Sequence, residues 1–136
     1  MRNISILSIC AVSMLTLSAC QTAKEAPNLA KLDVDFSWVG TSACSSKSPA
    51  FSIENVPAET ATLKFLMTDL DKRTFNHGGG TVAYSGGSAV PAGAFSYTGP
   101  CPPSGSHTYQ WDVQALNAAG DMILGKGTAT APFPPK

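Results

Sequence analysis

The amino-acid sequence predicts an all-β domain built as an antiparallel β-sandwich, and three observations favour this fold class. From His107 to Ala115, apolar and polar side chains alternate strictly, which is typical of a half-buried strand. Residues 62–69 show a similar alternation. Charged residues make up only 13% of the 136 residues, and 12 glycines and 10 prolines supply the many turns of a short-stranded fold.

The first 19 residues have the features of a bacterial lipoprotein signal peptide. Arg2 supplies a positive charge, and Ile4–Thr16 is mostly apolar but short for a membrane span. Residues 17–20, Leu-Ser-Ala-Cys, match the lipobox, which predicts lipidation of Cys20 and cleavage before it; an uncleaved or ordinary signal peptide is the alternative. Gln21, where an Asp would retain the protein at the inner membrane, favours a location at the outer membrane, facing the periplasm.

The rest of the chain divides into a tether and one domain. Residues 20–31 are polar and rich in alanine, which predicts a flexible tether behind the lipidated cysteine. Residues 32–136 have the length of a single domain. The formal net charge is zero, which argues against a nucleic-acid partner, because binding to a phosphate backbone needs a basic excess.

Two cysteines, Cys44 and Cys101, remain in the domain, and in an exported protein such a pair predicts a disulfide. Two separate thiols are the alternative. A bridge would attach the proline-rich loop around Cys101 to the segment before Ser48-Pro49. The cysteines and the two distant histidines lack a recognised metal-ligand spacing, so neither a metal nor another cofactor is expected.

The strands that the alternation and the turn residues predict are residues 34–39, 50–53, 62–69, 81–84, 107–116 and 122–130. Residues 71–80 and 85–94 are expected to form loops, and residues 117–120 a hairpin turn. The proline-rich residues 131–136 are expected to lie outside the sheet. No segment shows a helical period.

A candidate site follows from the ends of the two strong strands. If the strands at residues 62–69 and 107–116 are antiparallel neighbours, Asp69 and His107 lie at the same end of the same face. The loop with Asp71 and His77 leaves from that end, and the stiff loop Gly99–Ser106 enters there. Imidazoles and free backbone N–H groups in glycine turns can bind phosphate oxygens or another small anion.

Each candidate also has a structural interpretation. An Asp at a strand end often caps a turn, and this interpretation is preferred for Asp71 alone. A lone histidine is often a satisfied core residue. The site interpretation is preferred for His107, whereas the residues alone leave the two interpretations of His77 evenly balanced.

The same stretches resemble the phosphatidylethanolamine-binding protein (PEBP) family, which includes the bacterial Raf-kinase-inhibitor-like proteins. The most specific match is Gly99–Tyr109, which resembles the family signature Gly-x-Pro-Pro-x-Gly-x-His-Arg-Tyr. Ser48-Pro49, Val56-Pro57 and Asp69-Leu70-Asp71 match weaker motifs in the same order. The resemblance extends from about Ser48 to Leu116.

The resemblance implies an antiparallel β-sandwich, trimmed at the C-terminus, with a pocket for a small anion or a phospholipid head group. The pocket residues that it implies are Asp69, Asp71, His77, Gly99, Pro100, His107 and Tyr109. Leu70, Asn76 and Thr108 depart from the usual Pro, Trp and Arg of the family, which favours a shallower pocket or one that no longer binds.

The sequence leaves three kinds of function open. The preferred hypothesis is a lipid-anchored envelope protein that binds a small anion or head group. The alternative is an interaction or inhibitor module with a vestigial pocket. An enzyme ranks last, because Ser104 and Ser106 are sequence neighbours of His107 and cannot face it as a nucleophile must face its base.

Overall fold

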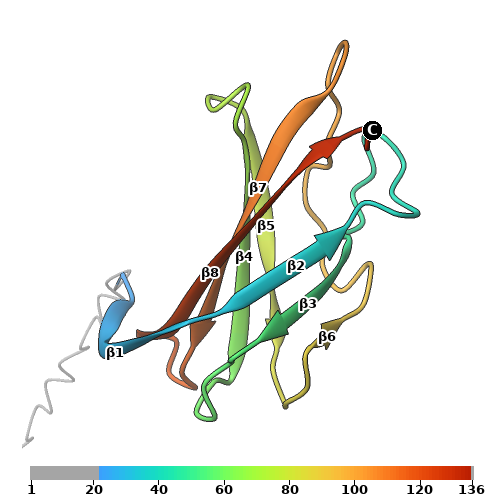
Figure 1. Cartoon of the computed structure of the whole chain (residues 1–136). Helices are drawn as coiled ribbons and strands as arrows, with labels where there is room; N and C mark the ends of the chain where they lie inside the picture. Colours follow the sequence, from blue (N-terminus) through green and yellow to red (C-terminus); the bar gives the residue numbers. More distant parts are fainter. Residues whose placement is uncertain (1–21, 136) are drawn as a thin grey trace, which may run out of the picture.

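The computed structural model describes residues 22–135, and their strands form two facing sheets (Figure 1). The larger sheet has the strand order β1-β8-β7-β4-β5, and the smaller one has the order β2-β3-β6. The strands are β1 (Lys24–Lys31), β2 (Asp33–Ser37), β3 (Ala50–Glu54), β4 (Thr62–Asp69), β5 (Asn76–Ala83), β6 (Ala89–Val90), β7 (His107–Leu116) and β8 (Met122–Phe133). The predicted all-β sandwich is confirmed.

Strands β4, β7 and β8 form the centre of the larger sheet. Strand β4 pairs antiparallel with β7 along its whole length, from Thr62 opposite Leu116 to Asp69 opposite Tyr109. The bounds of β4 and β7 agree with the prediction, because their inward side chains at alternate positions are almost completely buried. The alternation in the sequence therefore identifies the face of each strand that packs against the other sheet.

The space between the sheets is filled mainly by aromatic rings. Trp111 on β7 is fully buried and lies edge-on to Phe51 of the opposite sheet, with ring centroids 5.2 Å apart. Phe65 and Phe95 stack at 4.8 Å. Such offset and edge-on pairs are the preferred aromatic geometries and add to the stabilisation from burial. The aromatic residues buried in this core are Trp38, Phe51, Phe65, Phe95, Tyr97, Tyr109, Trp111 and Phe133.

The interpretation of residues 24–31 as a flexible tether was wrong. These residues form strand β1, which runs parallel to β8 at the edge of the larger sheet. The larger sheet is therefore mixed rather than purely antiparallel. The chain then crosses to the smaller sheet at Leu32, whose N–H donates to the carbonyl of Lys126 at 2.8 Å.

Three predictions of segments outside the sheets also need correction. Within the predicted loop of residues 85–94, Ala89–Val90 form strand β6, which pairs with β3. Residues 76–80 are not loop but the first part of β5, where Gly79 and Gly80 let the strand lie close to the backbone of Phe65 and to the ring of Phe95. Residues 131–133 are not a free tail, since they continue β8 opposite His107–Tyr109. Pro132 is tolerated there because β1 pairs only with the other end of β8, which leaves this end at the edge of the sheet.

The cysteine prediction is confirmed, since Cys44 and Cys101 form a disulfide. The predicted signal peptide over residues 1–19, the lipidation of Cys20 and the sorting signal at Gln21 all lie outside the described residues. Within residues 22–135, no helix is long and apolar enough to cross a membrane.

Candidate functional site

Asp69 and His107 meet at one end of the larger sheet. Asp69 is the last residue of β4, and it lies directly opposite Tyr109 in the register of β4 and β7. His107 begins β7 two residues before Tyr109 and therefore shares its face. The Nδ1 atom of His107 lies 2.7 Å from Oδ2 of Asp69, so the antiparallel geometry expected from the sequence is present.

The carboxylate of Asp69 accepts hydrogen bonds at both oxygens. The backbone N–H groups of Asp71 and Lys72 donate to Oδ1 at 2.9 and 3.0 Å, and His107 donates to Oδ2. Burial alone would raise the pKa of Asp69, but these hydrogen bonds and the attraction to His107 outweigh burial and lower the pKa below its ordinary value. Asp69 is therefore ionised at neutral pH.

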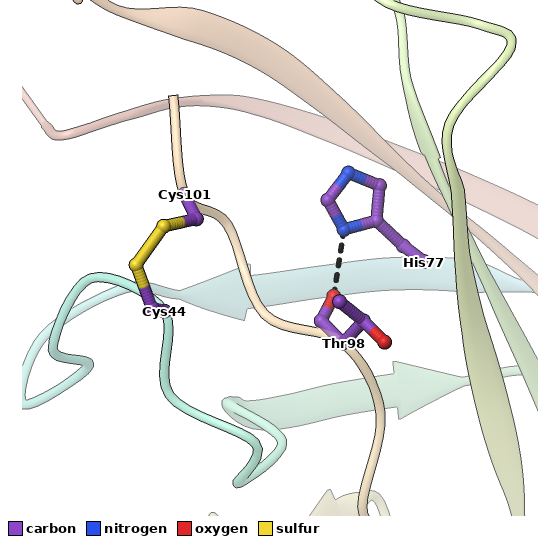
Figure 2. Close-up of a disulfide and its surroundings, with 4 residues drawn as sticks. All are labelled: Cys44, His77, Thr98 and Cys101. Carbon is purple, nitrogen blue, oxygen red and sulfur yellow. Dashed lines mark hydrogen bonds between the residues drawn. A yellow bond between two sulfur atoms is a disulfide. The ribbon is translucent and has the colours of Figure 1, made fainter. Parts of the chain in front are cut away.

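His77 reaches the same cluster from β5, although it was expected in a loop. Its Nδ1 atom lies 2.6 Å from the carbonyl oxygen of Thr98, a contact drawn in Figure 2. Its Nε2 atom lies 4.0 Å from Oδ2 of Asp69, and the side chain is only 4% exposed. Two buried or half-buried imidazoles thus share one carboxylate.

The proline-rich loop forms the opposite wall of the site. The disulfide joins Cys101 to Cys44 (Figure 2). The N–H of Cys44 also donates to the carbonyl of Pro100 at 2.8 Å. A Cβ atom at Gly99 would lie 1.8 Å from the backbone oxygen of Ser45, so only glycine fits between the two segments. The wall is therefore held by a covalent bond, a backbone hydrogen bond and a close backbone contact.

These groups surround a cavity of about 330 Å³, a size suited to a small molecule. Phe75 lies tilted against His77 with ring centroids 4.6 Å apart, and Tyr109 meets the same imidazole edge-on at 5.4 Å. Burial and the charge of Asp69 raise the pKa of Tyr109 to about 12, so its phenol stays neutral. The lining residues are Asp69, Lys72, Phe75, His77, Thr98, Gly99, Cys101, Pro102, Pro103, His107 and Tyr109.

Five of the seven residues proposed for the pocket line this cavity: Asp69, His77, Gly99, His107 and Tyr109. Asp71 and Pro100 do not line it. The carboxylate of Asp71 instead accepts the N–H of Thr108 at 2.6 Å, which agrees with the structural interpretation preferred for it. Pro100 is buried behind the wall with its carbonyl bonded to Cys44.

Lys72, Phe75 and Thr98 were missed as lining residues. Lys72 and Phe75 stand in a segment of ordinary loop composition, and their role depends on how that loop folds back over β5. Thr98 precedes the proline-rich motif and contributes through its backbone carbonyl, which no side-chain pattern reveals. Among residues 22–135, no group of three or more His, Cys, Asp and Glu side chains is placed to hold a metal ion.

One comparison, with the solved structures, found a similar protein. The structure is similar to that of the protein named "Putative PhosphatidylEthanolamine-Binding Protein (PEBP) Homolog CT736" from Chlamydia trachomatis. The two chains are 18% identical with a TM-score of 0.49, and the match covers 80% of this chain and 99% of that one. No protein-family model and no curated protein matches the sequence.

Proposed function

We propose that this chain is a binding protein of the bacterial envelope, lipid-anchored through Cys20, whose cavity takes a small anion or the phosphate-bearing head group of a phospholipid. The observation that carries the proposal is the cluster of Asp69, His77 and His107 beside a cavity with a rigid wall. Polar groups that converge in a largely apolar, pre-formed cavity are typical of small-molecule sites.

The charges around the cavity support an anionic ligand. Lys72 lines the cavity, and its ammonium group takes part in no ion pair recorded for residues 22–135. The charge of Asp69 is spread over three hydrogen bonds, one of them from the imidazole of His107, so it repels an anion less than a free carboxylate would. The resemblance of residues 99–109 to the PEBP signature supports the same ligand class.

The serine and cysteine side chains near the cavity favour binding without catalysis. The hydroxyl of Ser106 donates to the carbonyl of Pro134 at 3.4 Å, and both domain cysteines are in the disulfide. Among the described residues, no Ser or Cys side chain hydrogen-bonds to either imidazole, as a nucleophile activated by a general base would.

A protein-binding module is the second candidate, and one surface favours it. Leu66 and Phe75 are each 49% exposed, although both are large and apolar. They line a shallow groove beside the cavity together with Arg73 and Asn76. A partner that covers this groove would also cover the cavity mouth at Phe75.

Histidine NMR separates the two candidates, because the chain has only two histidines. Titration with inorganic phosphate or phosphoethanolamine should shift the ring signals of both His77 and His107. Lys72→Ala should weaken binding about threefold to tenfold, whereas Lys64→Ala, an exposed change on β4, should leave it unchanged. Silent histidine signals at millimolar ligand would contradict the pocket and favour the protein-binding module.

A further inference from the structure

The disulfide between Cys44 and Cys101 joins two surface segments (Figure 2). Both cysteines are exposed, and Cys101 is one of the residues that line the cavity. Exposed disulfides are the ones that thiols reduce most readily, and they include the regulatory ones. The bridge in the cavity wall is therefore accessible to a reductant from the solvent.

The first half of the wall, residues 95–100, is held by backbone hydrogen bonds. The N–H of Thr98 donates to the carbonyl of His77 at 2.9 Å, and the N–H of Cys44 donates to the carbonyl of Pro100 at 2.8 Å. None of these bonds involves a sulfur atom. This half of the wall should therefore keep its place when the disulfide is reduced.

The second half of the wall, residues 101–106, lacks such support. Within the described part of the chain, no backbone group of this segment bonds to another backbone group. Pro102 and Pro103, which both line the cavity, have no N–H to donate. The backbone of this segment therefore cannot hold it against the sandwich as the first half is held.

Two polar contacts remain in the second half besides the disulfide. The hydroxyl of Ser106 donates to the carbonyl of Pro134 at 3.4 Å, which is long for a hydrogen bond. The backbone of Cys101 hydrogen-bonds the phenol of Tyr109. The covalent bridge is therefore the strongest link between this half of the wall and the rest of the domain.

From this division of the wall we infer that the disulfide is a redox switch for the cavity. A thiolate of a dithiol reductant attacks one sulfur, the S–S bond breaks, and the second thiol of the reductant displaces the first from the mixed disulfide. The reductant is oxidised to its own disulfide, and its two protons pass to the thiols of Cys44 and Cys101. Residues 101–106 are then released, whereas residues 95–100 and the two sheets stay in place. The inference concerns regulation of the site, and it rests on the proposed function for its ligand.

Reduction of the full chain by dithiothreitol tests the release of the loop. The ¹⁵N order parameters of residues 101 and 104–106 should fall from about 0.85 to below about 0.6. Trp38 and Trp111 are buried in the core, so their fluorescence should stay that of the folded chain. Unchanged order parameters in a chain with two verified thiols, or the fluorescence of an unfolded chain, would overturn the switch.

Inorganic phosphate tests the effect on binding. Phosphate should bind the reduced chain about tenfold more weakly than the oxidised chain. Because such coupling is reciprocal, saturating phosphate should raise by the same factor the ratio of reduced to oxidised dithiothreitol at which half of the chain is reduced. Sodium chloride at equal ionic strength is the control. Equal affinities for the two forms would overturn the switch and leave the proposed anion pocket standing. If phosphate does not bind even the oxidised chain, the proposed function fails, and the order parameters alone decide the inference.

Two variants separate the bridge from the other contacts of the loop. Cys44→Ala/Cys101→Ala should have the mobile loop and the weak phosphate binding of the reduced chain, and dithiothreitol should change neither. Ser106→Ala removes only the bond to Pro134 and should keep the oxidised loop ordered, with an affinity for phosphate within about twofold. An ordered loop in the folded double variant would overturn the role of the disulfide.

Discussion

Nδ1 of His107 lies 2.7 Å from Oδ2 of Asp69, although 38 positions separate the two residues in the sequence. The contact exists because β4 ends where its antiparallel neighbour β7 begins. The buried carboxylate also stabilises the turn after β4, because it accepts hydrogen bonds from the N–H groups of Asp71 and Lys72. One side chain thus joins two strands, a turn and an imidazole.

Asp69→Asn should lower the free energy of unfolding by about 2 kcal/mol at pH 7, because the amide accepts fewer of the three hydrogen bonds. The pKa of Asp69 is lowered in the folded chain, so its stabilisation is complete above the ordinary value of 3.8 and is lost as the pH falls through the lowered pKa. The difference between wild type and variant, measured by denaturant unfolding, should therefore narrow below about pH 4. Glu59→Gln at an exposed position is the control, and a difference that stays constant to pH 2 would refute this account.

Reduction of the disulfide between Cys44 and Cys101 should lower the free energy of unfolding by about 4 kcal/mol, since the bridge closes a loop with a sequence separation of 57. Unfolding in guanidinium of the oxidised and the reduced chain measures the loss. The same reductant should not affect a Cys44→Ala/Cys101→Ala double variant. An unchanged unfolding midpoint in a chain with two verified thiols would be inconsistent with the bridge as a stabiliser.

Gly99→Ala should lower the free energy of unfolding by about 3 kcal/mol, because the new Cβ would collide with the backbone oxygen of Ser45, which cannot rotate away. The change should also weaken ligand binding, since the wall of the cavity must shift. Gly105→Ala is the matched control in the same loop: its Cβ would meet open space, and its positive φ costs only about 1 kcal/mol. Equal losses for the two variants, by thermal or denaturant unfolding, would contradict the steric explanation.

Tyr97→Phe should raise the free energy of unfolding by about 1 kcal/mol. The hydroxyl of Tyr97 is buried without a hydrogen-bond partner among the described residues, and burial raises its pKa well above the usual range. Removing the hydroxyl keeps the ring against Trp111 and abolishes the cost of burying an unpaired polar group. Tyr84→Phe, at a half-buried ring, should have little effect, and a destabilised Tyr97→Phe variant would reveal a partner for the hydroxyl.

The sequence predicted the centre of the site better than its surroundings. The contact between Asp69 and His107 could be predicted from two strands with alternating apolar and polar residues. The alternation shows which face of each strand is buried and where the strand ends. The role of Lys72 and Phe75 depends on the path of a loop, which no periodicity encodes.

The errors at β1 and β5 have a common cause. Strand β1 is exposed along most of its length and is held by backbone pairing to β8, so its side chains show no apolar alternation. The glycines of β5 have no side chains that could alternate, and they are needed for close contact with Phe65 and Phe95. Pattern analysis detects strands through buried side chains, and it misses strands that the backbone alone holds in place.

The parallel pairing of β1 with β8 places the start of β1 and the candidate site at opposite ends of the larger sheet. Lys24 pairs with Met122 at one end of β8, whereas Phe133 at the other end lies opposite His107. At about 3.3 Å for each residue step, the two ends are roughly 35 Å apart. A chain held at a membrane by its N-terminus would therefore hold the mouth of the cavity away from its own bilayer, and would sample ligands dissolved in the space beyond it or carried by an opposing surface.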